Sequence, residues 1–327
     1  MKAYLFEELS NKKVKCLACS HHCIILNNGK GLCSVRQNRE GVLFLDAYGC
    51  AASYGVDSVE KKPLYHFLPG SLTFSFGTLG CNFRCGFCQN HDISLPSSFS
   101  YKKNLSPEDA VRLALEKGCD SISYTYTEPA VFSEYALDTA RLAKKKGLKN
   151  VLVSNGFFSL ESLEAFCDVV DAVNIDLKSF SDDFYKKNCG ARLEPVLRSI
   201  KFFLDRGIWV EVTTLVIPGF NDSEDNLRKI ARFLVSLSKD IPWHVSRFFP
   251  SYKFKDVPPT SLSVLNKAAS IGKEEGLSFV YVGNVSGSSD TFCANCGLLL
   301  IKRNNFNTSI NISNGICVCG TKLRGVF

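Results

Sequence analysis

Short apolar runs alternate with amphipathic stretches from Leu72 to about residue 285, and this pattern most limits the folds open to the chain. The apolar runs are rich in Val, Ile, Phe and Tyr, as buried parallel strands are. We expect strands over residues 71–80, 121–127, 150–155, 171–178, 208–219, 243–250 and 278–285. We expect amphipathic helices between them, over residues 106–117, 131–146, 160–167, 194–205, 223–237 and 261–275.

Repeated strand–helix units predict a parallel sheet with right-handed crossovers, and therefore an α/β fold. Six or seven such units are typical of a partial or full α/β barrel, and an open doubly wound sheet is the structural alternative. At 327 residues the chain is long enough for a barrel with added parts. We expect a cysteine-rich N-terminal segment over residues 1–70, the barrel over residues 71–285, and a small C-terminal tail over residues 286–327.

Polar residues stand at the carboxyl end of most of the expected strands. Taken singly, a segment such as Asn155-Gly156 is typical of a turn or a helix cap. In a barrel, however, the carboxyl ends of the strands converge on one face, where α/β barrels place their sites. The sequence therefore predicts a ring of polar groups at one mouth. The ring comprises Glu128, Asn155, Asp176, Lys178, Asn221, Asp222, His244, Arg247 and Asn284.

The composition favours a globular protein without a membrane segment. Apolar residues make up 45% and charged residues 22% of the chain, a balance that argues against disorder. The first residues lack the apolar stretch of a signal peptide, and the longest uncharged stretch, residues 67–83, is interrupted by Pro and Gly. We therefore expect a cytoplasmic location and no membrane partner. The net charge of +7 has no long basic run behind it, so a nucleic-acid partner is not expected.

Fifteen cysteines, most of them in three groups, are the strongest chemical signal in the chain. In an unexported chain of this size, clustered cysteines indicate metal ligands rather than disulfides. Thiolate ligands are negative, so metal sites at these groups offset much of the positive charge. The N-terminal cysteine group is Cys16, Cys19, Cys23 and Cys33, the cluster cysteines are Cys81, Cys85 and Cys88, and the C-terminal cysteine group is Cys293, Cys296, Cys317 and Cys319.

The cluster cysteines have the spacing Cys-x3-Cys-x2-Cys and directly follow the first expected strand. Three thiolates bind three irons of a cubane cluster and leave the fourth iron open. Zinc usually takes four ligands, or three ligands and a water, and this spacing is not common for zinc. Gly80 and Gly86 let the loop turn tightly. The sequence therefore predicts an iron–sulfur cluster at this loop.

The loop sequence over residues 80–90, GCNFRCGFCQN, resembles the signature of the radical S-adenosylmethionine (SAM) superfamily. That signature has the same cysteine spacing and an aromatic residue before the third cysteine, a place that Phe87 fills. Over nearly the whole chain, the sequence resembles the AmmeMemoRadiSam-system radical SAM enzymes, which are related to pyruvate formate-lyase activating enzymes. This wider resemblance rests on both flanking cysteine groups and on residues 60–70 and 124–129. It implies a radical SAM partial (β/α)6-type barrel with a C-terminal metal knuckle.

The resemblance implies a role for each matching residue. The three cluster cysteines would ligate a [4Fe-4S] cluster, and Phe87 would lie against the adenine of SAM. Glu128 matches the glutamate of a Gly-Gly-Glu motif that receives the SAM amino group. Tyr126 and Thr127 replace the two glycines of that motif, which is a departure from the family pattern.

Further matches concern the rest of the SAM molecule. Asp176 and Lys178 match an Asp-Leu-Lys motif of the activating enzymes that meets the methionine and ribose parts of SAM. Asn155 and His244 match polar positions that line the same cavity. The resemblance thus implies a SAM site built from the carboxyl ends of several strands.

The resemblance also implies the reaction. A reduced cluster donates one electron to SAM, the S–C5′ bond breaks, and a 5′-deoxyadenosyl radical abstracts hydrogen from a substrate. This describes a radical-generating enzyme of the oxidoreductase type, which needs an electron donor such as ferredoxin or flavodoxin. Memo-type and AMMECR-type proteins are implied as partners, whereas the resemblance names no substrate.

Two other functions are open from the sequence. The first is a glycyl-radical-enzyme activase, which shares the core and installs a radical on the backbone of a partner protein. The second is a non-catalytic, zinc-stabilised protein that binds nucleic acid or acts as a scaffold. The modest charge and the lack of a basic, aromatic surface pattern count against the second.

The flanking cysteine groups predict further metals. The N-terminal group offers four thiolates, and its spacing suits zinc or a second iron–sulfur cluster equally. His21 and His22 lie within this group and are alternative ligands. The C-terminal group has the spacings Cys-x2-Cys and Cys-x-Cys, typical of a zinc-ribbon or rubredoxin-like site for zinc or iron, although the second pair is one residue short.

Four cysteines lie outside the groups. Cys50, Cys119 and Cys167 are expected to be buried apolar residues. Cys189 follows the Asp-Leu-Lys segment in a loop that contains Gly190, and we expect it to pack in the core or to face the cavity.

Overall fold

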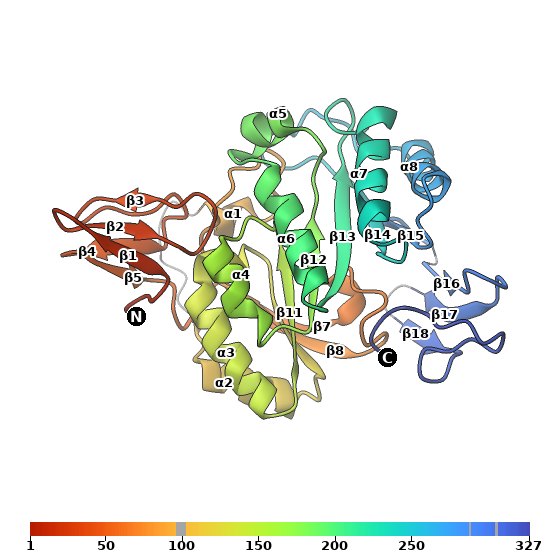
Figure 1. Cartoon of the computed structure of the whole chain (residues 1–327), viewed down its shortest axis with the longest axis horizontal. Helices are drawn as coiled ribbons and strands as arrows, with labels where there is room; N and C mark the ends of the chain where they lie inside the picture. Colours follow the sequence, from red (N-terminus) through yellow and green to blue (C-terminus); the bar gives the residue numbers. More distant parts are fainter. Residues whose placement is uncertain (96–102, 288, 305–306) are drawn as a thin grey trace.

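An eight-stranded sheet forms the middle of the molecule, and a small β unit lies at each end of it (Figure 1). The computed structural model describes residues 1–95, 103–287, 289–304 and 307–327. Strand β7 (Ser53–Ser58) pairs antiparallel with β8 at one edge of the sheet. The parallel strands are β8 (Leu72–Gly77), β10 (Ser121–Tyr124), β11 (Lys149–Ser154), β12 (Ala172–Asp176), β13 (Trp209–Val216), β14 (Trp243–Arg247) and β15 (Val280–Gly283).

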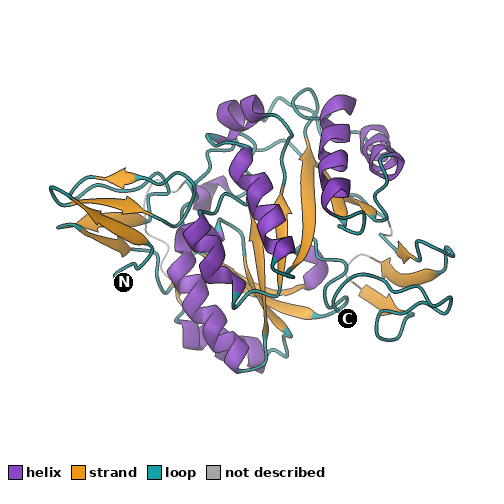
Figure 2. Cartoon of the chain, viewed as in Figure 1, coloured by secondary structure: helices purple, strands orange, loops and turns teal. Residues whose placement is uncertain are grey.

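A helix follows each of the first six parallel strands and precedes the next one (Figure 2). Contacts between helices also follow the chain, with α2 against α3, α3 against α4, α4 against α6, and α7 against α8. Six strand–helix units therefore make up the central body. The helices are α2 (Pro107–Glu116), α3 (Ser133–Lys145), α4 (Leu160–Cys167), α6 (Glu194–Asp205), α7 (Glu224–Leu237) and α8 (Leu262–Glu274).

The strand order distinguishes the two folds that the sequence left open. Each parallel strand pairs with the strand before it in the chain, from β8 to β15, without a reversal of direction across the sheet. A doubly wound sheet requires such a reversal. Within the described ranges β7 and β15 end the sheet and are not hydrogen-bonded to each other. The α/β prediction is confirmed, and the barrel is partial.

Serine side chains set where several helices begin. Ser106 Oγ accepts a hydrogen bond from the backbone N–H of Asp109 at 3.0 Å, and Ser159 does the same for Ser162 at 3.0 Å. These bonds satisfy backbone donors that have no partner inside the helix. Helix α3 begins later than expected because a 3₁₀ turn, η2 (Pro129–Phe132), precedes it.

Short elements fill the connections between the larger ones. None of the helices in the described part of the chain is both long enough and apolar enough to cross a bilayer. The short elements are η1 (Val59–Lys61), α1 (His91–Ser94), α5 (Asp182–Phe184), the π-helical turn η3 (Tyr185–Cys189), and the paired strands β6 (Cys50–Ala51) and β9 (Lys103–Asn104).

The N-terminal β unit is joined to helix α3 by a buried ion pair. Arg36 Nη1 donates to Glu134 Oε1 at 3.0 Å, and Arg36 Nε donates to the Val131 carbonyl at 2.9 Å. Both charged side chains are buried, so loss of either one would leave the other without its partner. The strands of this unit are β1 (Phe6–Leu9), β2 (Lys13–Cys16), β3 (Ile24–Ile25), β4 (Arg36–Arg39) and β5 (Val42–Leu45).

The C-terminal β unit contacts the opposite side of the central body. The hydroxyls of Thr291 and Tyr281, a residue of β15, lie 2.7 Å apart, and the His66 Nδ1 atom lies 2.9 Å from the Arg324 carbonyl. The three-region division stays a prediction, and strand β7, from the first 70 residues, belongs to the central sheet. Ser288, within the expected C-terminal tail, lies outside the described residues. The strands here are β16 (Thr291–Phe292), β17 (Leu299–Asn304) and β18 (Asn307–Ile310).

We predict that Gly77→Ala destabilises the sheet beside the cluster loop. A methyl group on Gly77 would lie 2.1 Å from the Thr125 carbonyl oxygen, so β8 and β10 would have to separate. We expect the free energy of unfolding to fall by ~1–3 kcal/mol, measured by urea unfolding. Gly55→Ala in the neighbouring strand β7 is the control, because a methyl group there meets no atom within 4 Å. Equal losses in the two variants would contradict this account.

Candidate active site

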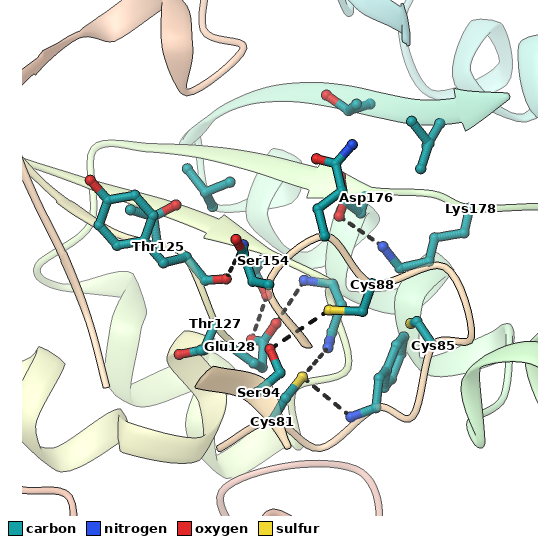
Figure 3. A pocket seen from close by; sticks show the side chains of 18 of the residues that line it. Cys81, Cys85, Cys88, Ser94, Thr125, Thr127, Glu128, Ser154, Asp176 and Lys178 are labelled. Carbon is teal, nitrogen blue, oxygen red and sulfur yellow. Dashed lines mark hydrogen bonds and ion pairs between the residues drawn. The ribbon is translucent and has the colours of Figure 1, made fainter. Parts of the chain in front are cut away.

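A cavity of about 360 Å³ opens at the carboxyl ends of the parallel strands. Its walls come from the ends of β10 to β14 and from the loop that follows β8. Figure 3 shows the three cluster cysteines gathered beside Ser154 and Asp176. The predicted site residues that line this cavity are Cys81, Cys85, Phe87, Cys88, Glu128, Asn155, Asp176 and Lys178.

The three cluster cysteines are spaced for a cluster rather than for a single ion. Among the described residues, their sulfur atoms are not all within 4.8 Å of one another. Burial raises the pKa of Cys81 well above its usual range. A hydrogen bond with Cys189, together with burial, does the same for the pKa of Cys85. A metal must therefore displace the thiol protons, and the donor set fits a [4Fe-4S] cluster on three thiolates.

The cluster loop is held from behind by turn η3. Arg84 N–H donates to the Cys189 carbonyl at 2.7 Å, and Gly86 N–H donates to the Asn188 carbonyl at 3.1 Å. Cys189 is fully buried next to Cys85 and does not line the cavity. Of the two positions expected for Cys189, the structure therefore shows packing behind the loop.

Glu128 joins two strand-end turns on one wall of the cavity. Its Oε1 atom accepts hydrogen bonds from Ala130 N–H at 3.0 Å and from the Ser154 hydroxyl at 2.7 Å. Its Oε2 atom accepts from Asn155 N–H at 2.7 Å. Burial raises the pKa of Glu128 to about 7 although these donors oppose the shift. Asn155 Nδ2 in turn donates to Asn82 Oδ1 at 2.8 Å, which connects this wall to the cluster loop.

Asp176 and Lys178 form an ion pair on the opposite part of the cavity lining. The Lys178 Nζ atom lies 2.8 Å from Asp176 Oδ2 and 5.9 Å from the centre of the Phe87 ring. Burial disfavours a charged ammonium, but the adjacent Asp176 carboxylate holds the pKa of Lys178 well above its usual range. Both side chains are charged groups within reach of a bound molecule, whereas the Phe87 ring is an apolar surface beside them.

Four residues of the predicted polar ring do not line the cavity: Asn221, Asp222, His244 and Arg247. Among them, His244 is the one expected to contact SAM. Its Nε2 atom lies 2.6 Å from Glu211 Oε2, and Glu211 also accepts the backbone N–H of His66 at 2.7 Å. Side chains two apart on a strand share a face. Ser246 lines the cavity, whereas His244, two residues earlier on β14 and further from the carboxyl end of the strand, does not. Its predicted contact with SAM has no support in this geometry.

The N-terminal segment supplies cavity residues that the sequence reasoning missed. Lys62 lines the cavity, and its Nζ atom donates to Asp57 Oδ2 at 2.7 Å. The Tyr126 hydroxyl donates to the same carboxylate oxygen at 3.1 Å. Burial opposes ionisation of Asp57, but Lys62 holds the pKa of Asp57 at about 2. A Lys-Lys-Pro segment alone does not reveal that it enters a barrel, so the sequence held no clear signal.

The two flanking cysteine groups differ in their geometry. In the C-terminal group, Cys293 Sγ lies 3.7 Å from Cys319 Sγ, and Cys296 Sγ lies 3.6 Å from Cys317 Sγ. All four sulfurs are within 4.8 Å of one another, as ligands of one tetrahedral ion are. The Cys-x-Cys spacing of Cys317 and Cys319, one residue shorter than Cys-x2-Cys, therefore does not keep the four sulfurs apart. The N-terminal group lines a separate small cavity without reaching this compact arrangement.

Comparisons with known proteins agree with this site. The model of the "Radical SAM superfamily" matches residues 76–234. An uncharacterised protein of Methanocaldococcus jannaschii is 44% identical over 98% of this chain and 98% of its own length. The pyruvate formate-lyase 1-activating enzyme of Escherichia coli is 24% identical over 47% of this chain and 65% of its length. A radical SAM methyltransferase structure from Sphaerobacter thermophilus aligns over 71% of each chain, with a TM-score of 0.53 and 19% identity, and shows the shared fold.

A partial barrel with a three-thiol loop at its mouth defines a radical-generating metalloenzyme. The chain belongs to the radical SAM superfamily and is related to pyruvate formate-lyase activating enzymes. The cofactors of this superfamily are a [4Fe-4S] cluster and SAM, and its general reaction is cleavage of SAM at the cluster. Membership favours catalysis over the non-catalytic alternative. The AmmeMemoRadiSam assignment and the individual residue roles stay predictions.

We predict that the C-terminal cysteine group binds one zinc or iron ion. Cys317→Ser removes a buried ligand, so we expect the protein to lose about one metal equivalent per chain. Metal analysis by mass spectrometry after gel filtration measures the loss. Cys167→Ser, at a cysteine outside all three groups, is the matched control. Unchanged metal content in Cys317→Ser would show that these thiols hold no ion.

Proposed function

We propose that this protein cleaves SAM reductively to a 5′-deoxyadenosyl radical, which abstracts hydrogen from a substrate. The observation that carries the proposal is that one cavity is lined by the cluster cysteines and by Glu128, Asn155, Asp176 and Lys178. A [4Fe-4S] cluster, when bound, supplies one electron for breaking the S–C5′ bond.

The side chains divide the work of binding SAM among them. The Glu128 carboxyl would accept the SAM amino group, and its bonds to Ser154 and Asn155 fix its position. Asp176 offers acceptor oxygens for ribose hydroxyls, and Lys178 offers a donor for the methionine carboxylate. All of these residues lie at or just after the ends of the neighbouring strands β10, β11 and β12. Their relative positions therefore depend on the rigid sheet. Such positioning supports a reaction at one atom of a flexible cofactor.

Apolar walls would protect the radical. Phe83, Phe87 and Leu215 line the cavity, and the two phenylalanines are almost fully buried. Carbon-lined walls hold few waters, which limits quenching of a reactive intermediate. Lys62, which is paired with Asp57, lines a further part of the cavity and would face a polar substrate.

We predict that SAM cleavage requires Cys85. The protein is reconstituted anaerobically with iron and sulfide, reduced, and given SAM, and 5′-deoxyadenosine is measured by liquid chromatography. We expect Cys85→Ala to lower its formation at least 100-fold, because a cluster ligand is lost. Cys119→Ala, at a buried cysteine outside the groups, keeps the wild-type rate. Binding of zinc alone, with no cluster in the wild-type protein, would overturn the proposed function.

A glycyl-radical-enzyme activase is the second candidate. It is favoured by relatives named as activating enzymes, including a putative one from Methanocaldococcus jannaschii that is 25% identical over 65% of this chain. These relatives align with part of the chain, and the N- and C-terminal cysteine groups are additions to the core of an activase. The AmmeMemoRadiSam resemblance instead favours Memo-type or AMMECR-type proteins as partners, with ferredoxin or flavodoxin as the electron donor.

We predict that the true partner or substrate accelerates SAM cleavage. Memo-type, AMMECR-type and glycyl-radical proteins from the same organism are added separately to the reduced enzyme with SAM. An activase gives a glycyl radical signal on the partner in electron paramagnetic resonance, in step with 5′-deoxyadenosine. Acceleration about tenfold or more by one protein without that signal favours a radical SAM enzyme that is not an activase. Acceleration by none would place the substrate among small molecules.

A further inference from the structure

The N-terminal cysteine group surrounds its own small cavity beside the cluster loop. All four of its cysteines line this cavity, together with His21, Arg36 and Asn82. Three of the four thiols are buried, and Cys23 is half-buried. Burial raises the pKa of Cys16 to about 11 and also raises the pKa of Cys19 well above its usual range. Four free thiols that line one space are a set of donors suited to a metal.

The spacing of these thiols separates the two kinds of metal site. The four sulfurs of the C-terminal group lie within 4.8 Å of one another, whereas no three of the N-terminal group do so, although all are described. The cluster cysteines share this wider spacing. A single zinc ion holds its thiolates close together, whereas the four irons of a cubane hold theirs apart. The N-terminal group therefore matches the cluster site and differs from the single-ion site.

Asn82 supplies a second, independent feature. This side chain is 2% exposed and lines the same cavity. Its Oδ1 atom accepts from Asn155 Nδ2, but its Nδ2 atom has no partner among the described residues. A buried donor without an acceptor costs about 1–3 kcal/mol. Sulfur atoms of an iron–sulfur cluster accept hydrogen bonds and would satisfy it.

The two cysteine sites share a wall of backbone. A methyl group on Gly80 would lie 2.5 Å from the Cys33 carbonyl oxygen, so the two chain segments touch there. His21 Nε2 lies 2.9 Å from the Asn82 carbonyl, and Arg84 Nη1 donates to the Cys81 carbonyl at 2.8 Å. Asn82 lines the N-terminal cavity and directly follows the ligand Cys81, so the cluster loop borders both sites.

We propose that the N-terminal cysteine group holds a second [4Fe-4S] cluster, ligated by all four of its thiolates and adjacent to the SAM cluster. With four protein ligands it has no open iron, so it exchanges single electrons and does not bind SAM. The His21 and His22 imidazoles are not needed as ligands, and His21 is engaged by the Asn82 carbonyl. This inference is independent of SAM cleavage, because its test counts iron and sulfide rather than activity.

The test uses a variant that leaves the whole N-terminal group in place. In Cys81→Ala/Cys85→Ala/Cys88→Ala, reconstituted anaerobically, we expect about four irons and four sulfides per chain, against about eight of each in the wild type. Sulfide is the decisive count, because a single iron at the C-terminal group carries none. Cys317→Ser added to the triple variant removes that ion and leaves the sulfide count unchanged.

A second measurement tests whether the two clusters are adjacent. When both clusters are reduced in the wild type, their proximity gives a broadened electron paramagnetic resonance spectrum that is not the sum of the separate clusters. Cys16→Ala/Cys19→Ala removes about four irons and leaves the simple spectrum of the SAM cluster. If the triple variant holds no sulfide but one zinc beyond the C-terminal ion, the group is a zinc site and the proposal fails. A wild-type spectrum equal to the sum would refute the adjacency.

Discussion

The parallel pairing of strands β8 to β15 in chain order is the constraint on which the rest of the molecule depends. It brings residues 81, 128, 155, 176 and 178, which are far apart in sequence, to one edge of the sheet. The close approach of Gly77 to the Thr125 carbonyl keeps β8 against β10 where the cluster loop begins. The chemistry of the site therefore depends on register, because a shift of one residue would turn Asp176, at the end of β12, to the other face and would displace the loops that follow the strands.

The sequence predicted what depends on local pattern and missed what depends on long-range contact. Helix 160–167 has the bounds of α4, because Ser159 and an amphipathic stretch define it locally. His244 was placed in the cavity because it lies on the correct strand. In the structure His244 instead contacts Glu211. A glutamate in an apolar strand indicates a buried partner, but the sequence does not show which residue that partner is. Lys62 reaches the cavity from a segment outside the barrel, and no periodicity in the sequence reveals this contact.

The cysteine spacings illustrate the same limit. Along the chain, Cys-x2-Cys pairs serve a single ion or a cluster equally well, so the sequence left zinc and iron–sulfur open at the N-terminal group. In three dimensions the choice depends on how far apart the backbone holds the thiols. The C-terminal hairpins bring their sulfurs to 3.6 Å and 3.7 Å, whereas the N-terminal loops hold theirs around a wider space. Ligand separation is a property of the fold, and it is the basis of the cluster proposed for the N-terminal group.

Metals at the flanking cysteine groups, as proposed above, would also stabilise the two small β units beside the barrel. The buried core of the N-terminal unit contains few side chains, such as Leu5, Val14 and Leu43, and that of the C-terminal unit is no larger. Units of this size bury too little apolar surface to be stable alone, and a metal that binds only the folded form supplies the difference. The Arg36–Glu134 pair then fixes the N-terminal unit on α3, next to the cluster loop. Loss of metal from this unit would loosen the wall at Cys33 and Gly80, so damage at one cysteine group is transmitted to the next.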